Sequence, residues 1–393
     1  MNELVETTAE ASEFVAAAQG LGTLIDENRE ALAKGPDLPQ PIADALIRAG
    51  LTQLWMPRSL GGPEIDPLGF VEAIEALAKL DGATAWCASI SSGASRFSGA
   101  IPAGTMRKLL PTGSTFAFNG SGHPSGAITR DGEGWRVSGR WTWMSFSRYS
   151  DIFVLMCIEH ENGEPLFAPS GMPKMRAVLL PAKQVQVGDN WNGGGLRSSG
   201  SNDVVCKDVY VPDNYTTTPD VPDRQPGPLY DLPMTSAAAI MVIGVPLGIA
   251  SASIDSLIAL AGTKVPFFSQ VPLSEQEIIQ LEVAWAKTRL HSARAFAVEA
   301  ISSLWASVSA GRPVSAEQQA MLRMACRNVG EAGKEIVGRM YSAAGSTAVL
   351  EDQPFSAQLR DVYAASQHIN FAARLMVTPG RILLGFDPGT NQI

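Results

Sequence analysis

Cysteine is scarce in this sequence, and its cysteines lie far apart. They have neither the paired spacing of a disulfide framework nor the close spacing of a zinc site. They are Cys87, Cys157, Cys206 and Cys326. The sequence therefore predicts no metal centre, and the isolated thiols indicate a reducing compartment, the cytoplasm.

Positive charge is also in deficit. Lys and Arg together number 30 against 39 Asp and Glu, which gives a net charge of -9. Because binding to nucleic acid requires a clustered excess of Lys and Arg, no nucleic-acid partner is predicted. The N-terminus is acidic where a secretory signal is basic, and we find no uninterrupted apolar run of membrane-spanning length. We therefore expect neither export nor a membrane partner.

The glycine-rich phosphate-binding motifs are missing as well. No Gly-x-Gly-x-x-Gly follows a strand and there is no P-loop, so a nucleotide-like cofactor must be held in another way. At 393 residues the chain exceeds what one core usually serves, so two or three subdomains are expected. Its 45% hydrophobic and 18% charged residues predict that other subunits cover apolar surface.

Three kinds of pattern follow one another along the chain. Helical spacing of apolar residues dominates the first hundred residues, and short β-type runs separated by Gly, Pro, Asn and Asp follow. An apolar stripe from Val283 to Leu304 then predicts one long helix, and the next helix starts near Ser315. The order predicts an α+β protein with a small β-barrel or sandwich between two helical parts.

Four segments resemble the acyl-CoA dehydrogenase superfamily, over about residues 50 to 384. They are residues 50–86, the run 139–145, the run 196–212, and Gly345-Ser346 with Arg360-Asp361. The resemblance implies an N-terminal helical domain, a small central β-barrel domain and a C-terminal four-helix bundle. The corresponding ranges are 1–112, 113–225 and 226–393. It also implies a flavin at a subunit interface and a homotetramer.

The last segment departs from the dehydrogenases at the position of their base. Those enzymes have Tyr-Glu-Gly after the Arg-Asp pair, and here His368, Ile369 and Asn370 align with it. Isoleucine cannot abstract a proton, and the surroundings of His368 resemble the two-component monooxygenases that use reduced flavin. The resemblance implies oxygenation of a small aromatic or heteroaromatic substrate through a flavin C4a-hydroperoxide. Reduced FAD or FMN from a separate NAD(P)H-flavin reductase, and molecular oxygen, are the implied cofactors.

Two residues are the candidate catalytic groups. Ser145 aligns with the family hydroxyl that hydrogen-bonds the flavin N5 region, although a serine can also simply end a strand. His368 is proposed to take or share the proton of the substrate, since the ordinary pKa of imidazole is about 6.5. A lone histidine is more often structural. We interpret Arg360 and Asp361 as an ion pair that holds the segment.

Other residues complete the predicted site. The predicted cofactor-binding residues are Trp143, Ser145, Ser121, Arg197, Gly345 and Ser346. Trp143 either shields one flavin face or packs in a core, as Trp141 could. Arg197 either contacts a flavin phosphate or pairs with Asp203. The candidate substrate-pocket residues are Trp86, Ile90, Phe118 and His123. The three apolar residues are core residues by default, and His123 lies in a Gly-, Pro- and Ser-rich turn where it could simply be exposed.

Two alternative functions stay open at this point. One is a FAD-dependent acyl-CoA dehydrogenase whose base lies elsewhere in the chain, although residues 257–268 contain no carboxylate. The other is an inactive scaffold member of the family. Flavin binding distinguishes them, because a dehydrogenase retains oxidised FAD tightly, an oxygenase of this kind binds it weakly, and a scaffold binds neither form.

Overall fold

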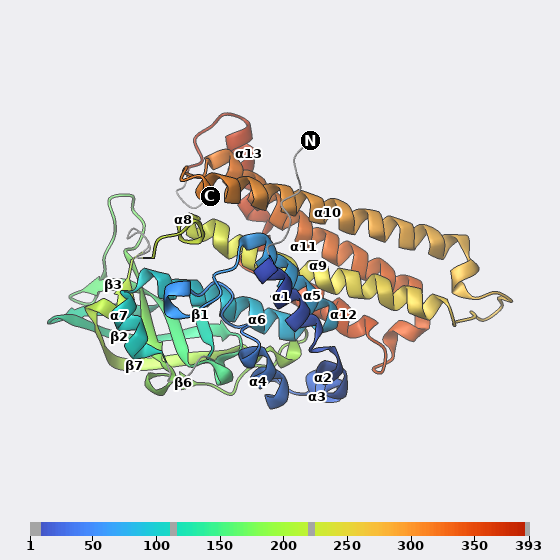
Figure 1. Cartoon of the computed structure of the whole chain (residues 1–393), viewed down its shortest axis with the longest axis horizontal. Coiled ribbons are helices and arrows are strands. Elements are labelled where there is room, and N and C mark those ends of the chain that lie inside the picture. Colours follow the sequence, from blue (N-terminus) through green and yellow to red (C-terminus); the bar gives the residue numbers. More distant parts are fainter. Residues whose placement is uncertain (1–8, 111–115, 219–224, 390–393) are drawn as a thin grey trace.

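The computed structural model describes residues 9–110, 116–218 and 225–389. A helical N-terminal part, a central sheet and a C-terminal helical part follow one another, so the α+β prediction is confirmed. Figure 1 shows the sheet at one end of the molecule and the long helices extending away from it. The expected boundary between residues 112 and 113 lies outside the described residues, and the domain limits stay predictions.

The N-terminal part consists of short helices. They are α1 (Ala9–Gln19), α2 (Gly22–Glu27), α3 (Arg29–Lys34), α4 (Gln40–Arg48), α5 (Pro67–Leu80), α6 (Gly82–Ser95) and α7 (Ala103–Leu109). Carboxylate side chains cap the N-termini of the two longest of these helices, α5 and α6. Asp66 accepts the N–H groups of Leu68 and Gly69, and Asp81 accepts that of Thr84 at 2.7 Å. These caps satisfy N–H groups that a helix start leaves unpaired, so they fix where α5 and α6 begin.

The central part is one eight-stranded sheet with the order β6-β7-β2-β1-β3-β5-β8, in which β4 pairs with β3. The strands are β1 (Phe118–Asp131), β2 (Gly134–Met144), β3 (Ile152–Glu161), β4 (Glu164–Pro165), β5 (Met175–Pro181), β6 (Gln186–Val187), β7 (Asn202–Pro212) and β8 (Thr216–Thr217). β1 and β3 are parallel, and the other pairs are antiparallel. Among the described residues no ladder joins β6 to β8, so hydrogen bonds do not close the sheet into a barrel.

Alternate residues of the sheet enter two different cores. Phe153 and Leu155 of β3 pack with Trp141 and Val204 on one face, in a cluster made only of sheet residues. Val154, between them, packs on the other face with residues of α6 and α7. This two-residue period is that of a strand buried on both faces, and it explains the nearly continuous apolar run in β3.

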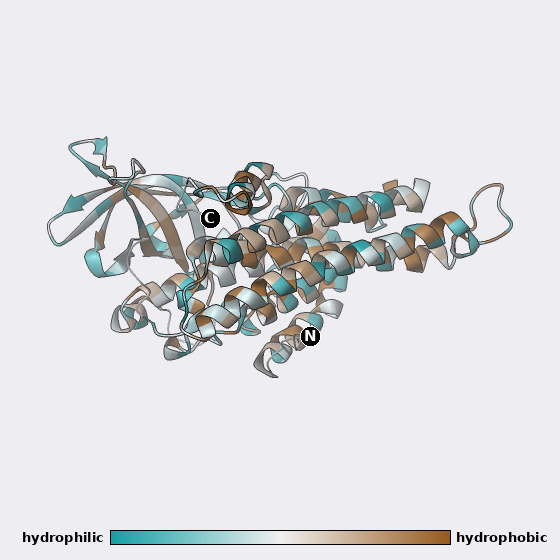
Figure 2. Ribbon diagram, turned by 90° about the horizontal axis from the view of Figure 1, so that it is seen from above, coloured by the Kyte–Doolittle hydropathy of each residue, from teal (hydrophilic) through white to brown (hydrophobic). Residues whose placement is uncertain are grey.

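The C-terminal part is a bundle of long helices. Its helices are α8 (Pro228–Asp231), α9 (Met234–Ala261), α10 (Glu277–Ser309), α11 (Ala316–Ala344), α12 (Phe355–Ala365) and α13 (Val377–Leu383). The helices predicted from the stripe 283–304 and from the start near Ser315 are α10 and α11. Ser315 and Gln318 form a reciprocal cap at the start of α11. Figure 2 shows hydrophobic stretches in the strands and along these helices.

Helix α9 is the central helix and is apolar on all sides. It packs against α10, α11 and α12 and, on another side, against α5. Of the described helices it alone is long and apolar enough to cross a membrane, yet 78% of its most apolar window is buried in the protein. A helix that is hydrophobic all round is typical of the core of a large protein.

Two glycines let the backbones of α5 and α9 approach closely. A Cβ added to Gly244 would lie 2.7 Å from the Val71 carbonyl oxygen, and one added to Gly248 would lie 2.4 Å from that of Glu75. No side chain fits at these distances. Because α5 leads directly into Asp81 and α6, this contact fixes α6 against the bundle.

Candidate active site

Three residues predicted from the sequence meet at one place between the sheet, α6 and the end of α12. The indole Nε1 of Trp86 donates a hydrogen bond to Ser145 Oγ at 3.0 Å. The same indole contacts the imidazole of His368, with ring centroids 5.6 Å apart and an interplanar angle of 70°. Trp86 therefore links the two candidate catalytic groups, which lie more than two hundred positions apart in the sequence.

Ser145 lies where β2 ends in a strained stretch of backbone. The register of β2 against β7 shifts between Trp141 and Met144, and Trp143 and Phe146 have φ values of 57° and 66°. Bulky residues seldom adopt positive φ, and such strain concentrates at functional sites. The shift leaves Trp141 fully buried and Trp143 76% exposed. Trp141 is therefore the core tryptophan, and Trp143 presents an open aromatic surface next to Ser145.

Other buried hydroxyls continue inward from Ser145. Its Oγ lies 2.8 Å from Ser201 Oγ, which lies 2.7 Å from Ser199 Oγ. Asn119 Nδ2 donates to the Ser145 carbonyl at 2.6 Å, and Asn119 Oδ1 has no hydrogen-bond partner among the described residues. Sequence reasoning did not identify Ser199, Ser201 or Asn119 as site residues. The only signal for the two serines was the family-like run 196–203, which gave no reason to select particular serines, and Asn119 had no signal in the sequence.

His368 is held by the turn that follows α12. Its Nδ1 accepts the backbone N–H of Asn370 at 3.4 Å, and the Asn370 side chain accepts a hydrogen bond from the buried Arg323 at 2.9 Å. Burial of the imidazole lowers the pKa of His368 to about 4. This value is well below the near-neutral pKa expected from sequence, because the charged ring would lose its hydration.

Asp361 does not form the ion pair expected with Arg360. Among the described ion pairs none joins these two side chains, and Asp361 Oδ1 instead accepts the Leu196 backbone N–H at 2.6 Å. Burial, together with the nearby charge of Asp81, raises the pKa of Asp361 to about 7. Asp361 thus connects α12 to the loop that carries Ser199 and Ser201, and the expected link between Asp361 and Arg360 is not formed among the described residues.

Comparisons with known proteins show which families and enzymes the chain is similar to. The family model described as acyl-CoA dehydrogenase, C-terminal domain, matches residues 240–373. The indole-3-acetate monooxygenase of Acinetobacter baumannii is 28% identical over 381 residues, which cover 96% of each chain. The C-terminal part of the chain is thus similar to the acyl-CoA dehydrogenase C-terminal domain.

Several relatives of this chain are monooxygenases. The flavin-dependent monooxygenase oxygenase subunit HsaA of Mycobacterium tuberculosis is 25% identical over 398 residues, which cover 98% of each chain. The crystal structure of the same protein has a TM-score of 0.89 at 22% identity, over 98% of this chain and 100% of that one. XiaF from Streptomyces sp., solved with FADH2 and glycerol, has a TM-score of 0.89 at 19% identity, over 98% of each chain. The two solved structures show that the fold is shared, and the sequence relative is a flavin-dependent monooxygenase.

The residues around Ser145 fit a flavin. Trp143 offers an exposed indole that suits stacking on a flat ring system. Ser145 offers a hydroxyl whose oxygen already accepts the Trp86 N–H, so its own proton can be donated. The unpartnered Oδ1 of Asn119 adds a buried acceptor beside the same serine. Polar atoms without partners are uncommon inside proteins, and this one lies beside the serine at which the resemblance locates the cofactor.

The predicted substrate-pocket residues lie in different surroundings. Trp86 is almost completely buried, and Ile90, one helical turn further along α6, is half-buried. Phe118 is fully buried in the core between the sheet and the N-terminal helices. His123 is exposed in the irregular part of β1, where it contacts Ser125 Oγ at 2.5 Å. The structure therefore brings Trp86 to His368 and leaves His123 at the surface.

Two of the predicted cofactor residues, Ser121 and Arg197, make local contacts outside the cluster of Ser145, Trp86 and His368. Ser121 is half-buried and accepts the His123 N–H at 3.3 Å. Arg197 is exposed and donates to the Lys34 carbonyl at 3.1 Å. It does not pair with Asp203, which binds Arg140 instead, so that alternative is wrong.

Gly345 and Ser346 lie at the far end of α11 from His368. Arg323, which reaches toward His368 through Asn370, is near the start of that helix. Between Arg323 and Gly345 the helix rises about 33 Å. Gly345 instead borders a surface hollow that Lys264 and Arg339 also line. Within one chain, therefore, Gly345 is remote from Ser145.

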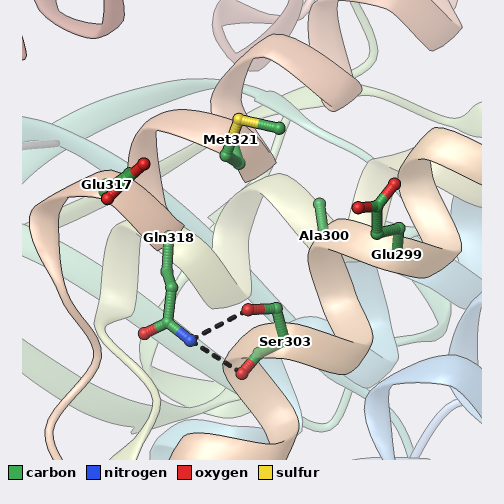
Figure 3. Close-up of a pocket in the computed structure, with 6 residues that line it drawn as sticks. All are labelled: Glu299, Ala300, Ser303, Glu317, Gln318 and Met321. Carbon is green, nitrogen blue, oxygen red and sulfur yellow. Dashed lines mark hydrogen bonds between the residues drawn. The ribbon is translucent and has the colours of Figure 1, made fainter. Parts of the chain in front are cut away.

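The close-up in Figure 3 shows a smaller hollow, between α10 and α11. Gln318 there donates from Nε2 to the carbonyl and hydroxyl oxygens of Ser303, both at 2.9 Å. Glu299, Glu317 and Met321 complete its lining, and none of these is a predicted site residue. The arrangement fastens the capped start of α11 to α10, and it is separate from the site around Trp86.

Proposed function

We propose that this chain is the oxygenase component of a two-component monooxygenase. It takes reduced FAD or FMN from a separate NAD(P)H-flavin reductase and oxygenates a small aromatic or heteroaromatic substrate. Reduced flavin, when bound, supplies the electrons that activate molecular oxygen. The observation that carries the proposal is the contact of one indole, Trp86, with both a hydroxyl donor and an imidazole. Ile369, at the position of the dehydrogenase base, supports it.

Ser145 and Trp143 are the residues proposed to hold the flavin ring. The Ser145 oxygen accepts a hydrogen bond from Trp86, and its O–H is directed to the cofactor. Trp143 covers the ring with its exposed indole and excludes water from the reacting face. Ser121 and Arg197 are proposed as further cofactor contacts at the edge of this site.

His368 is proposed to hold the proton of the substrate. Its pKa of about 4 keeps the ring neutral at pH 7. Hydrogen bonding from Asn370 to Nδ1 places the ring proton on Nε2, but a 3.4 Å contact is weak. The other tautomer, with a free lone pair on Nε2, is therefore accessible at small cost. In that form the ring shares the proton of a phenol or an indole as the substrate attacks.

The complete cofactor site is proposed to need a second subunit. Gly345 and Ser346 are too far along α11 to reach a flavin held by Ser145 of the same chain. They can contact that flavin only from a neighbouring subunit, as in the homotetramer that the resemblance implies. Lys264, whose Nζ donates to the Ala344 carbonyl at 2.6 Å, lies beside Gly345 and offers a positive charge to a flavin phosphate.

The cytoplasm is the proposed location. All four cysteines are free and buried, so the fold needs no oxidising compartment. NAD(P)H and a flavin reductase are also available there.

The proposal is tested by a reconstituted reaction. The purified chain is mixed with a flavin reductase, NADH, FAD or FMN, and a panel of phenols, indoles and thiophenes under ¹⁸O₂. A product that gains one ¹⁸O atom, and that is absent when the reductase acts alone, is expected. Tight binding of oxidised FAD with desaturation of an acyl thioester would show a dehydrogenase instead. Binding of neither flavin form would show a scaffold.

A further inference from the structure

The hydroxyl groups behind Ser145 form a chain with a definite direction. Ser145 Oγ has two close neighbours, Trp86 Nε1 and Ser201 Oγ. An indole N–H only donates, so Ser145 accepts from Trp86. Each serine hydroxyl carries one proton, so the protons of Ser145, Ser201 and Ser199 either all point toward the cofactor side or all point inward.

Burial selects between these directions. If the hydroxyl protons point inward, the last of them belongs to Ser199. This residue is 1% exposed, and its Oγ has only Ser201 as a partner among the described residues. An unpaired buried donor costs free energy. Pointing outward, Ser199 donates to Ser201 and Ser201 donates to Ser145. The free proton is then on Ser145, beside the exposed Trp143, where a ligand can accept it.

The backbone holds the two segments at this spacing. Phe146 donates its N–H to the Ser199 carbonyl at 2.8 Å, and Ser147 Oγ donates to the Gly200 carbonyl at 3.0 Å. Gly200 has a φ of 55°, so the chain turns there and brings both flanking serines to the same side. The hydroxyl chain is therefore part of a rigid junction between the end of β2 and the start of β7.

We propose that Ser201, supported by Ser199, is a positioning residue that fixes Ser145 as a hydrogen-bond donor toward the flavin. This inference rests on the proposed function for the identity of the acceptor. In the outward direction Ser145 Oγ accepts from both Trp86 and Ser201, so both lone pairs are used and only its proton is available. Two incoming hydrogen bonds also polarise the remaining O–H and strengthen it as a donor.

The test compares Ser201→Ala with Ser198→Ala. Ser198 lies in the same loop and is equally buried, but its Oγ has no hydrogen-bond partner among the described residues. Ser201→Ala is expected to weaken anaerobic binding of reduced flavin about threefold to tenfold, as loss of one hydrogen bond predicts. Ser198→Ala is expected to leave the dissociation constant unchanged.

A double-mutant cycle separates positioning from a general structural role. If Ser201 acts through Ser145, then Ser145→Ala combined with Ser201→Ala weakens flavin binding no more than Ser145→Ala alone. Additive losses would overturn the proposal. Should Ser201→Ala fail to fold, Ser199→Ala takes its place in the cycle, and additivity there has the same meaning.

A flavin-free measurement keeps this test distinct from that of the proposed function. The protein is labelled with 5-fluorotryptophan, and the ¹⁹F resonance of Trp86 is assigned with Trp86→Phe. Ser201→Ala is expected to shift this resonance, because Ser145 loses the neighbour that fixes its hydroxyl, whereas Ser198→Ala is not. An unchanged resonance in Ser201→Ala contradicts the proposal that Ser201 positions the Ser145 hydroxyl. If the resonance shifts but the unmodified protein binds no reduced flavin, the hydrogen-bonded row of serine hydroxyls is supported and the proposed function is wrong.

Discussion

The imidazole of His368 is surrounded closely enough that burial lowers its pKa to about 4, and it rests against Trp86. At neutral pH the ring is therefore uncharged and is able to hold a proton of the substrate. The same burial makes it a weaker base than a free histidine. For a weak base, correct placement next to the substrate has more effect than basicity.

Replacing His368 with Ala is expected to lower product formation by at least about 100-fold, the usual range for loss of acid–base assistance. Oxygen consumption should continue and end in hydrogen peroxide. The ratio of peroxide to product, measured with reductase-supplied flavin, checks this. Gln367→Ala, an exposed neighbour, is the matched control. A normal product yield from His368→Ala would remove this residue from the chemistry.

At the level of secondary-structure elements, Asp361 connects α12 to two other parts of the site. It accepts the Leu196 N–H, and its surroundings include Asp81, the cap of α6, and Gly82. These contacts hold the helix that precedes His368 against the helix that carries Trp86. Burial and the charge of Asp81 raise the pKa of Asp361 to about 7, so its ionisation opposes this packing.

Asp361→Asn is expected to change how stability depends on pH. A carboxyl whose pKa is raised by folding makes its full contribution to stability below its pKa in the unfolded chain, which is near 4. This stability is lost as the pH rises through the folded pKa of about 7. Asparagine keeps an oxygen for the Leu196 N–H but does not ionise. At pH 8 the variant should gain on the order of 4 kcal/mol in the free energy of unfolding, since the pKa is raised by about three units and one unit corresponds to about 1.4 kcal/mol. Urea unfolding at pH 5 and pH 8 measures this, and an equal difference at both values would contradict it.

The crossing of α5 and α9 depends on glycine. Gly248→Ala would place a methyl carbon 2.4 Å from the Glu75 carbonyl oxygen and force the helices apart. We expect a loss of about 1 to 3 kcal/mol in the free energy of unfolding, the usual cost of overpacking. Gly338→Ala, in α11 with nothing within 4 Å of the added carbon, is the control. It should be neutral or stabilising by up to about 1 kcal/mol, because alanine favours helix.

At the scale of the whole molecule, the far end of the bundle has an exposed apolar surface. In the loop between α9 and α10, Phe267 is 88% exposed and Phe268 is 96% exposed, and Val265 is also exposed, as is Leu281 near the start of α10. We expect another subunit to cover this surface, as the proposed oligomer requires. It lies near Gly345, the residue that the proposed function assigns to a neighbouring flavin site.

Replacing Phe267 and Phe268 together with Ser is expected to reduce the molecular mass of the assembly in light scattering. Flavin affinity should fall in parallel, because Gly345 and Ser346 would no longer reach the neighbouring site. Phe167→Ser, at an exposed position in the sheet domain, is the control and should change neither quantity. An unchanged mass with unchanged flavin affinity would show that this surface serves another purpose.

The sequence predicted the order of the three parts, because apolar periodicity is a local property that helix and strand geometry impose directly. It predicted α10 closely, and the cap at Ser315 marked the start of α11. The sequence predicted a small β-barrel or sandwich in the central part, but it could not tell whether the sheet closes, since closure depends on whether edge strands meet. Trp141 and Trp143 could not be told apart, because a bulge in β2 sends the second to the surface.

The sequence by itself determined that isoleucine, Ile369, stands where the dehydrogenases have their glutamate, and that a histidine precedes it, because these facts depend only on which residues are present. Tertiary structure alone decided that Trp86 joins Ser145 to His368, that Asp361 bonds Leu196 rather than Arg360, and that buried serines support Ser145. The pKa values of His368 and Asp361 were decided there too. Hydrogen bonds and desolvation act between atoms that folding brings together from distant positions, and no local pattern encodes those distances.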